Sequence, residues 1–313
     1  MTDDAEHRDA TLPEDGLHVP TSATPRPRHT GLVVVVAVIV IAAVVAGVVL
    51  GLGGSRPTAA AAAVVREASR TTLAASSSDL TITGSVVANG QTLSLSGSGA
   101  LDFIRRTSQI DLAANGASVS TTDDEIIAGD QAYVSFTSGS TSISTLVPGK
   151  SWLAVPLPAA ASPSSGPGGL VNVVGALQLL QSQGATVTSL GASTIDGTAV
   201  TGYRVSLSTS TLLAAARQAI ATEHLPAAEA AVALQAVRTM SMSLTVWADG
   251  ANLLRRMDLT VSETTNGTAL DESMQIDLSN FGTPVSVTVP PTSAVATLAQ
   301  FQSALARLGG SAG

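Results

Sequence analysis

The chain has 313 residues, no cysteine and only 12% charged residues, and its length allows one or two domains. The missing cysteines exclude disulfides, thiolate metal sites, cysteine nucleophiles and an anchor through a lipid-modified cysteine. A net charge of −8 with a single lysine, Lys150, argues against nucleic acid as a partner, because nucleic acid binding needs clustered positive charge.

A polar tail and a long apolar run come first in the chain. Residues 1–30 are polar and show no apolar periodicity, so we predict a disordered tail. Residues 31–54 are 24 residues without a charge. As a helix, such a run is about 36 Å long, which exceeds a hydrocarbon core of about 30 Å. We therefore predict that residues 31–54 cross a membrane.

The same run has a second interpretation, a cleaved signal peptide with small residues at 58–61 as the cleavage site. The run is longer than the usual ~7–15 apolar residues of a signal peptide, which favours an uncleaved signal anchor. Arg26 and Arg28 precede the run, and Arg56 alone follows it closely. The positive-inside rule then places the tail in the cytoplasm and residues 55–313 outside the plasma membrane.

The first half of the outer region predicts one helix followed by strands. Residues 58–77 are Ala-rich and favour a helix. Asn89-Gly90 is a strong hairpin signal, and Leu93 and Leu95 then alternate with polar residues on the next strand. Further strands are expected near 107–113, 117–127 and 130–137.

The second half predicts a loop at 158–169, an amphipathic helix ending near Gln181, and helical residues 210–237 interrupted at Pro226. Alternating residues predict strands near 185–193, 199–208, 240–246, 253–261 and 274–278. Val285, Val287 and Val289 predict one more strand, before an amphipathic helix from Val295 to Leu308. Hairpins with segregated helices indicate an α+β fold, in which helices cover a large curved antiparallel sheet after one transmembrane helix.

Catalytic and metal-binding patterns are sparse. His224 is the one histidine outside the tail, and no serine stands in a G-x-S-x-G elbow, so we predict no catalytic residue, metal or cofactor. A hydrolase would require His224 to face a buried serine. Asp123-Asp124-Glu125, followed by Asp130, could offer oxygen ligands to calcium. Because the EF-hand spacing is absent, a solvated strand end or turn is the favoured interpretation.

Methionine placement is the most informative feature of the last third. Met240, Met242, Met257 and Met274 fall on the apolar faces of consecutive predicted strands. A flexible, polarizable wall of methionine can adapt to an apolar ligand, although ordinary core packing beneath a helix explains the same pattern. Arg105-Arg106 and Arg255-Arg256 each place one arginine on either strand face, where an ion pair or a position at the mouth of a barrel is favoured over contact with a lipid head group.

The outer region resembles the LppX/LprG-type lipoproteins of the actinobacterial envelope, which are similar in shape to the LolA/LolB lipoprotein carriers. The resemblance spans roughly 60–291 and includes a long helix before a hairpin meander. Its motifs are Ile195-Asp196-Gly197 leading to Tyr203-Arg204-Val205, Val246 to Gly250 with Leu253 to Arg256, and Ile276 to Val285 ending in Val289-Pro290.

The resemblance implies a half-open β-barrel whose helices cover an apolar cavity that holds acylated lipids for transfer across the envelope. It departs from the family pattern in one respect, because a predicted transmembrane helix replaces the lipidated cysteine. A fixed anchor permits loading at the membrane surface and makes long-distance shuttling doubtful. The side chains expected to line the cavity are Leu93, Leu95, Val134, Phe136, Tyr203, Val205, Met240, Met242, Met257, Leu259, Met274 and Ile276.

We therefore predict a membrane-anchored, non-enzymatic protein that binds an acylated lipid or another apolar ligand outside the plasma membrane. The alternative is a structural or interaction module of the envelope whose core is filled by its own side chains. The two hypotheses differ in whether the cavity is open to a ligand or filled by the protein's own side chains.

Overall fold

The computed structural model describes residues 59–88, 90–117, 120–156, 173–181, 185–206, 208–223, 227–265 and 268–310. The predicted tail and span (1–54), the loop at 158–169 and His224 lie outside the described residues. Among the helices that are described, none has the length and apolar character needed to cross a membrane.

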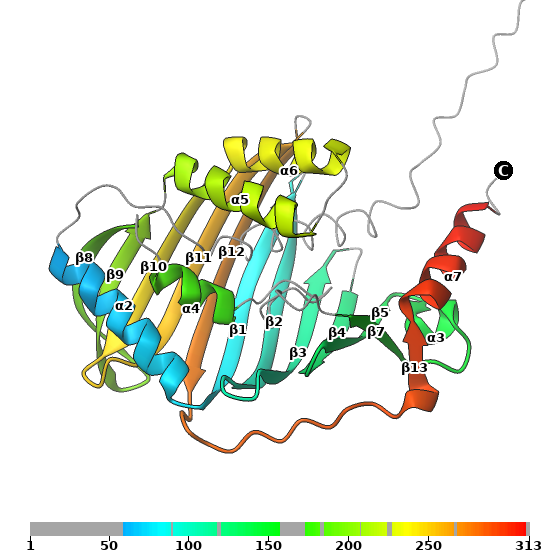
Figure 1. Cartoon of the computed structure of the whole chain (residues 1–313), viewed down its shortest axis with the longest axis horizontal. Helices are drawn as coiled ribbons and strands as arrows, with labels where there is room; N and C mark the ends of the chain where they lie inside the picture. Colours follow the sequence, from blue (N-terminus) through cyan, green and yellow to red (C-terminus); the bar gives the residue numbers. More distant parts are fainter. Residues whose placement is uncertain are drawn as a thin grey trace, which may run out of the picture.

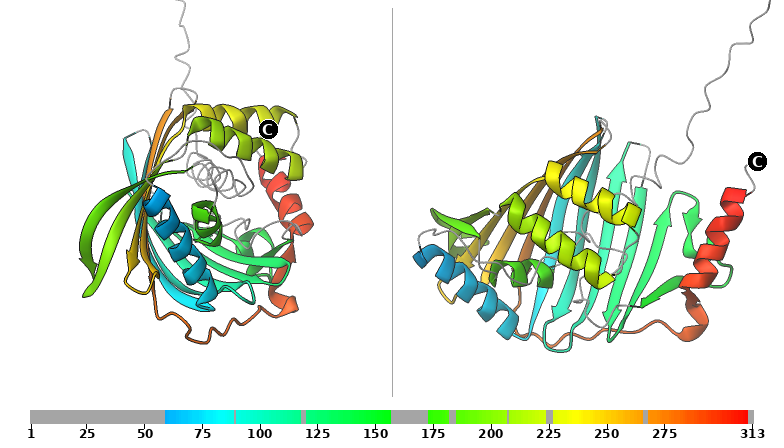
Figure 2. Two further views of the ribbon diagram at one scale, coloured as in Figure 1. Left: turned by 60° about the vertical axis from the view of Figure 1, so that its left-hand side comes forward. Right: turned by 45° about the horizontal axis from the view of Figure 1, so that its top comes forward.

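Thirteen strands form one strongly curved sheet (Figures 1 and 2). The first meander contains β1 (Ser77–Ala88), β2 (Gln91–Asp102), β3 (Thr107–Gly116), β4 (Ser120–Ala128) and β5 (Gln131–Ser138), with β6 (Thr141–Ser142) and β7 (Trp152–Pro156) beside β5. The second contains β8 (Thr186–Ile195), β9 (Thr198–Ser206), β10 (Ser241–Asp249), β11 (Leu254–Thr265) and β12 (Thr268–Ser279).

The two meanders join where β1 pairs with β12. This antiparallel ladder runs from Asp79 opposite Ser279 to Ala88 opposite Leu270. The strand order is therefore β13-β7-β5-β4-β3-β2-β1-β12-β11-β10-β9-β8. The predicted antiparallel sheet is confirmed except at one edge, where β13 (Val295–Thr297) pairs in parallel with β7.

Helices cover one face of the sheet, which we call the concave face (Figures 1 and 2). Near β8 to β12 lie α2 (Ala59–Ala74) and α4 (Val173–Gln181), and α5 (Thr209–Glu223) and α6 (Ala227–Thr239) lie beside them. At the β13 edge, α3 (Ile143–Leu146), the short η1 (Thr292–Ala294) and α7 (Leu298–Gly310) complete the fold.

Buried hydroxyls fix α2 in place. The Ser69 hydroxyl donates to the carbonyl of Leu177 in α4, and the side-chain amide of Gln181 donates to Ser69 Oγ at 3.2 Å. The backbone N–H of Leu254 in β11 donates to Thr72 Oγ1 at 2.9 Å. Because both hydroxyls are fully buried, each bond satisfies polar groups that would otherwise be costly to enclose.

Two of the predicted tight turns are present. Ala88 pairs with Gln91, so β1 and β2 form a tight hairpin at the predicted place, with Gly90 at a φ of 73°. Asp249-Gly250 starts the turn between β10 and β11, where Asp249 Oδ1 accepts hydrogen bonds from the N–H groups of Ala251 and Leu253. This Asx geometry is what favours aspartate at such a position.

Three expectations from the sequence are wrong. Residues 283–290 form no strand and run along the lower end of the sheet (Figure 1). Val285 and Val287 are partly buried there while their neighbours are exposed, which explains the alternating pattern. The flanking prolines remove ladder donors there. Arg105-Arg106 lies in the β2–β3 turn rather than within a strand, and the C-terminal helix begins at Leu298 because Val295 belongs to β13.

Glycines on the concave face of β2 let the neighbouring strands pack closely. Gly97 lies between Ile82 of β1 and Leu112 of β3, and a Cβ atom at Gly97 would be 2.6 Å from both the Asp111 carbonyl oxygen and Leu112 Cδ2. Large side chains from β1 and β3 close over this position and belong to one buried cluster.

We expect Gly97→Ala to lower the free energy of unfolding by about 1–3 kcal/mol, because the backbone contact forces the two strands apart. The exposed neighbour Ser98→Ala should change it by less than about 0.5 kcal/mol. Urea unfolding followed by circular dichroism measures both, and equal stability of the two variants would show that the sheet yields freely at Gly97.

Candidate functional site

The strand registers place all of the predicted cavity residues except Met240, which lies just before β10, on the concave face. Directly opposed residues of neighbouring strands point to the same side of a sheet. One row of cross-strand partners contains Ile276, Met257 and Tyr203, and the next contains Met274, Leu259 and Val205. Leu95 continues the second row, Leu93 and Met242 lie in the row after it, and Val134 and Phe136 lie at the other end of the same face.

The end of this face near β9 to β12 is filled by the protein itself. Met257 is 2% exposed and packs in one cluster with Val65 of α2 and Leu177 of α4. The same cluster takes in several other predicted lining residues. These are Tyr203, Val205, Met274 and Ile276. At this end, the structure therefore corresponds to ordinary core packing beneath helices.

Four predicted residues that lie near α5 and α6 are only partly buried, and we call them the methionine seam: Leu93, Met240, Met242 and Leu259. They pack against a separate small cluster on β1, β2, β11 and β12 that includes Leu95. Met240 and Met242 also contact the cluster that joins α5 to α6. The methionine seam therefore lies where the sheet meets α5 and α6, outside the filled core under α2 and α4.

The two remaining predicted residues lie at the β5 end of the concave face. Val134 is 6% exposed. The ring of Phe136 meets that of Phe301 in α7 edge to face, with 6.2 Å between centroids. This aromatic contact holds α7 over the end of the sheet, so the face is covered by helices at both ends.

Two carboxylates lie on the concave face between these helices. Asp123 is the cross-strand partner of Leu112 and Phe136, and Glu125 is the partner of Ile110 and Val134. Glu125 is 7% exposed, and the Oδ1 atom of Asp123 is enclosed without a hydrogen-bond partner among the described residues. The expectation of a solvated acidic cluster is wrong for both residues, although Asp124 does point to solvent on the opposite face.

Burial controls the ionisation of this pair. Loss of hydration raises the pKa of Asp123 to about 7, and repulsion by Asp124 adds to the effect. Burial, and then repulsion by Asp123, raises the pKa of Glu125 to about 7. Both groups are therefore poised to exchange a proton, or to gain a cationic partner, near neutral pH.

A buried serine adds to the polar content of this region. Ser108 is 4% exposed, and its Oγ atom has no hydrogen-bond partner among the described residues. It pairs with Ile127, two residues along the ladder from the pair of Ile110 and Glu125. Glu272 is also buried on the concave face, between Val86 and Val261, but it makes an interaction of its own.

A period-two pattern could have located Asp123 and Glu125. Counting back from Ile127 in steps of two gives Glu125 and Asp123 on the face of an apolar residue. The run of three consecutive acidic residues instead favoured a solvated segment. The sequence of β4 alone does not show that both of its neighbours present large apolar side chains at the same level.

The arginine pair of β11 is occupied by structural contacts. Arg256 Nε donates to Asp277 Oδ1 at 2.5 Å on the outer face, and Arg255 Nε donates to Asp249 Oδ2 at 2.6 Å. Burial raises the pKa of Asp249, but the Leu253 N–H and Arg255 outweigh it and lower that pKa overall. The guanidinium of Arg255 also lies 4.9 Å from the Phe281 ring centroid. The ion-pair interpretation of Arg255-Arg256 is confirmed.

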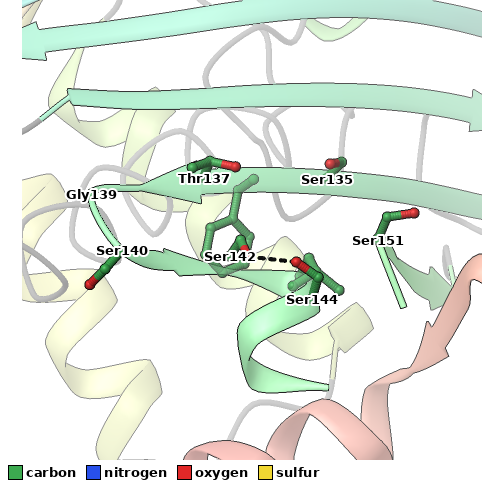
Figure 3. A pocket seen from close by; sticks show the side chains of 9 residues that line it. Ser135, Thr137, Gly139, Ser140, Ser142, Ser144 and Ser151 are labelled. Carbon is green, nitrogen blue, oxygen red and sulfur yellow. Dashed lines mark hydrogen bonds between the residues drawn. The ribbon is translucent and has the colours of Figure 1, made fainter. Parts of the chain in front are cut away.

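A small hydroxyl-lined pocket of about 270 Å³ lies beside β5 and β6 (Figure 3). Its lining includes Ser135, Ser140 and Ser151, and no charged side chain. The Ser142 hydroxyl there accepts the Thr145 N–H at 3.2 Å and caps α3. Because this pocket is smaller than most small-molecule sites, we assign it no ligand.

Catalytic and metal chemistry gain no support within the described part of the chain. No group of three or more histidine, aspartate or glutamate residues there could hold a metal ion. The hydrolase hypothesis depends on His224, which lies outside the described residues, so it has no test here.

No protein-family model and no curated protein sequence matches the chain. Among solved structures, the chain is similar to LprF from Mycobacterium bovis, with 18% identity, a TM-score of 0.40, and coverage of 75% of this chain and 99% of that one. The Mycobacterium tuberculosis lipoprotein LppX gives 18% identity and a TM-score of 0.35, with coverage of 72% and 98%.

A domain from Vibrio parahaemolyticus, named for outer membrane lipoprotein sorting, gives 10% identity and a TM-score of 0.25, with coverage of 72% of this chain and 94% of the domain. All three structures are less than 20% identical to this chain. At scores this low, we take neither a ligand nor family membership from them.

The raised pKa values give a pH-dependent stability. Because the folded state binds these protons more tightly than the unfolded chain, their stabilising contribution is complete below about pH 4 and is lost as the pH rises toward 7. When the pH is raised from 5 to 8, we expect the free energy of unfolding of the wild-type protein to fall by about 2 kcal/mol more than that of Glu125→Gln, because the glutamine does not ionise.

Urea unfolding at the two pH values measures this difference, and the same amide substitution at the exposed Asp130 controls for removal of a charge. An identical difference between Glu125→Gln and wild type at both pH values would mean that Glu125 is already ionised in the folded protein at pH 5.

Proposed function

We propose that this chain is a membrane-anchored, non-enzymatic protein that binds an acyl-chain ligand on the concave face of its extracytoplasmic domain. The partial burial of the methionine seam carries this proposal. Leu93, Met242 and Leu259 lie on the face that forms the core elsewhere, and Met240 precedes β10 beside them, yet the protein leaves all four incompletely covered. An apolar ligand would complete that cover.

The chemistry of the seam fits acyl chains better than small polar molecules. Each methylene removed from water contributes about 0.8 kcal/mol, so affinity would grow with chain length. Methionine side chains have three rotatable bonds and adapt to irregular apolar shapes. Recognition at the seam would therefore depend on apolar length and volume rather than on a fixed pattern of hydrogen bonds.

The position of α2 supports loading at the membrane surface. The apolar run ends at Gly54 and α2 begins at Ala59. Even fully extended, the connection between them spans only about 18 Å. If residues 31–54 cross the membrane, the sheet covered by α2 stays close to the lipid from which it would draw its ligand.

A structural or interaction module with a filled core remains the second candidate. The complete packing of Met257, Met274 and Tyr203 under α2 and α4 favours it at that end of the sheet. Such a module would act through its surface and would bind no lipid on the concave face. The location of bound ligand therefore distinguishes the two functions.

Photo-cross-linking of the full chain in membranes with a diazirine fatty acid measures this location. We expect adducts on peptides of β2, β10 and β11 that carry the methionine seam. A Leu93→Trp/Met242→Trp variant should lose these adducts, because indole rings would fill the space of the ligand. It should keep any adducts on residues 31–54, which serve as the internal control for surrounding lipid.

Adducts confined to residues 31–54 in the wild-type protein, with none on the folded domain, would contradict ligand binding and favour the filled-core module. Circular dichroism of the double variant verifies that the sheet is intact.

The orientation can be tested directly because the chain contains no cysteine. We expect an impermeant maleimide to label Ser98→Cys, which lies on an exposed position of β2, in intact cells. It should label Ser22→Cys in the tail only after the cells are opened. The opposite pattern would place the folded domain in the cytoplasm.

A further inference from the structure

The strongest unexplained feature of the concave face is its pair of carboxylates on β4. Asp123 and Glu125 are two residues apart on one strand, so their Cβ atoms lie about 7 Å apart on the same side of the sheet. Apolar residues flank both positions, with Leu112 and Phe136 beside Asp123. The Oδ1 atom of Asp123 is enclosed without a hydrogen-bond partner among the described residues, and none of the ion pairs in that part of the chain includes Asp123 or Glu125.

Ser108 supplies an independent sign of a missing partner. Its hydroxyl is nine-tenths buried, faces the same side as Glu125, and has no hydrogen-bond partner among the described residues. Burying a carboxylate oxygen and a hydroxyl without partners is costly, and most buried polar groups in folded proteins are paired. A polar group from a bound molecule would supply the missing hydrogen bonds.

These groups lie within reach of the methionine seam. Leu95 on β2 lies two strands across and two residues along from Asp123, about 12 Å away, and Leu93 lies two residues further along, about 16 Å away. One ligand could therefore extend from the carboxylates on β4 to the partly buried apolar residues under α5 and α6. The polar end of such a ligand would lie below α7, next to the contact between Phe136 and Phe301.

We infer that Asp123 and Glu125 bind the protonated primary amine at the polar end of an acyl-chain ligand, and that Ser108 lies beside this site, next to Glu125. This inference rests on the proposed function and specifies the class of its ligand. An ammonium group donates three hydrogen bonds and carries the charge that two adjacent carboxylates lack. An ammonium group beside the two carboxylates would favour their ionised forms, whereas burial alone favours their protonated forms.

Other polar ends fit these residues less well. A phosphate or carboxylate would place a third negative charge in an apolar surrounding without a described arginine or lysine beside it. An alcohol could hydrogen-bond to the pair but would leave its charge uncompensated. A metal ion is a poor fit too, because no third histidine or acidic side chain joins the two carboxylates in the described part of the chain.

Matched photoactivatable probes test the inference in the full chain. Two diazirine alkyl chains of equal length, one ending in a primary amine and the other in an alcohol, are cross-linked in membranes at pH 8. We expect the amine to label peptides of β2 to β5 with about ten-fold higher yield than the alcohol, the ratio for one charge-assisted hydrogen bond. Asp123→Asn/Glu125→Gln should remove the preference and leave labelling by the alcohol unchanged.

Asp124→Asn is the matched control, because Asp124 lies between the two residues but faces solvent. It should retain the preference for the amine. Equal labelling by both probes in the wild-type protein, or an amine preference that survives in Asp123→Asn/Glu125→Gln, would overturn the inference while leaving acyl-chain binding intact. Absence of label from the folded domain with either probe would instead contradict the proposed function.

Discussion

The pairing of β1 with β12 is the interaction on which the rest of the molecule depends. It joins a meander that begins near residue 77 to one that ends near residue 279, and it creates the continuous concave face. The row that contains Leu93, Val86, Glu272, Val261 and Met242 crosses this junction. Without the junction, the two halves of the candidate site would belong to separate sheets. Such non-local pairing is slow to form, so we expect the site to assemble late in folding.

The concave face is divided by what covers it. Under α2 and α4 it is a closed core, held by buried hydroxyls of α2 and by tightly packed methionine and tyrosine side chains. Under α5 and α6 the methionine seam is only partly covered, and toward α7 the face carries two buried carboxylates, one of which, Asp123, has an oxygen without a partner among the described residues. The same sheet thus forms a stable core at one end. At the other end it has apolar side chains that are only partly covered and buried polar groups that lack partners among the described residues. An amphipathic ligand combines the apolar and polar groups that this second part lacks.

The sequence predicted the strands well because one-sided burial leaves a period-two pattern, as in Met240 to Val246. It also located the Asn89-Gly90 turn from backbone preferences that act locally. It could not place Asp123 and Glu125, because their burial comes from Leu112 and Phe136 on neighbouring strands rather than from β4 itself. It also could not separate the filled core from the methionine seam, since both have the same alternation. Val285 to Val289 led to the opposite error, because these residues alternate with polar ones but form no strand.

Native mass spectrometry of the full chain released from detergent micelles tests ligand binding most directly. We predict one stoichiometric ligand mass that persists under activation strong enough to remove surrounding lipid. This mass should be absent from the Leu93→Trp/Met242→Trp variant. A wild-type protein that shows only its own mass, and takes up no added acyl-chain amine or lipid, would contradict ligand binding on the concave face.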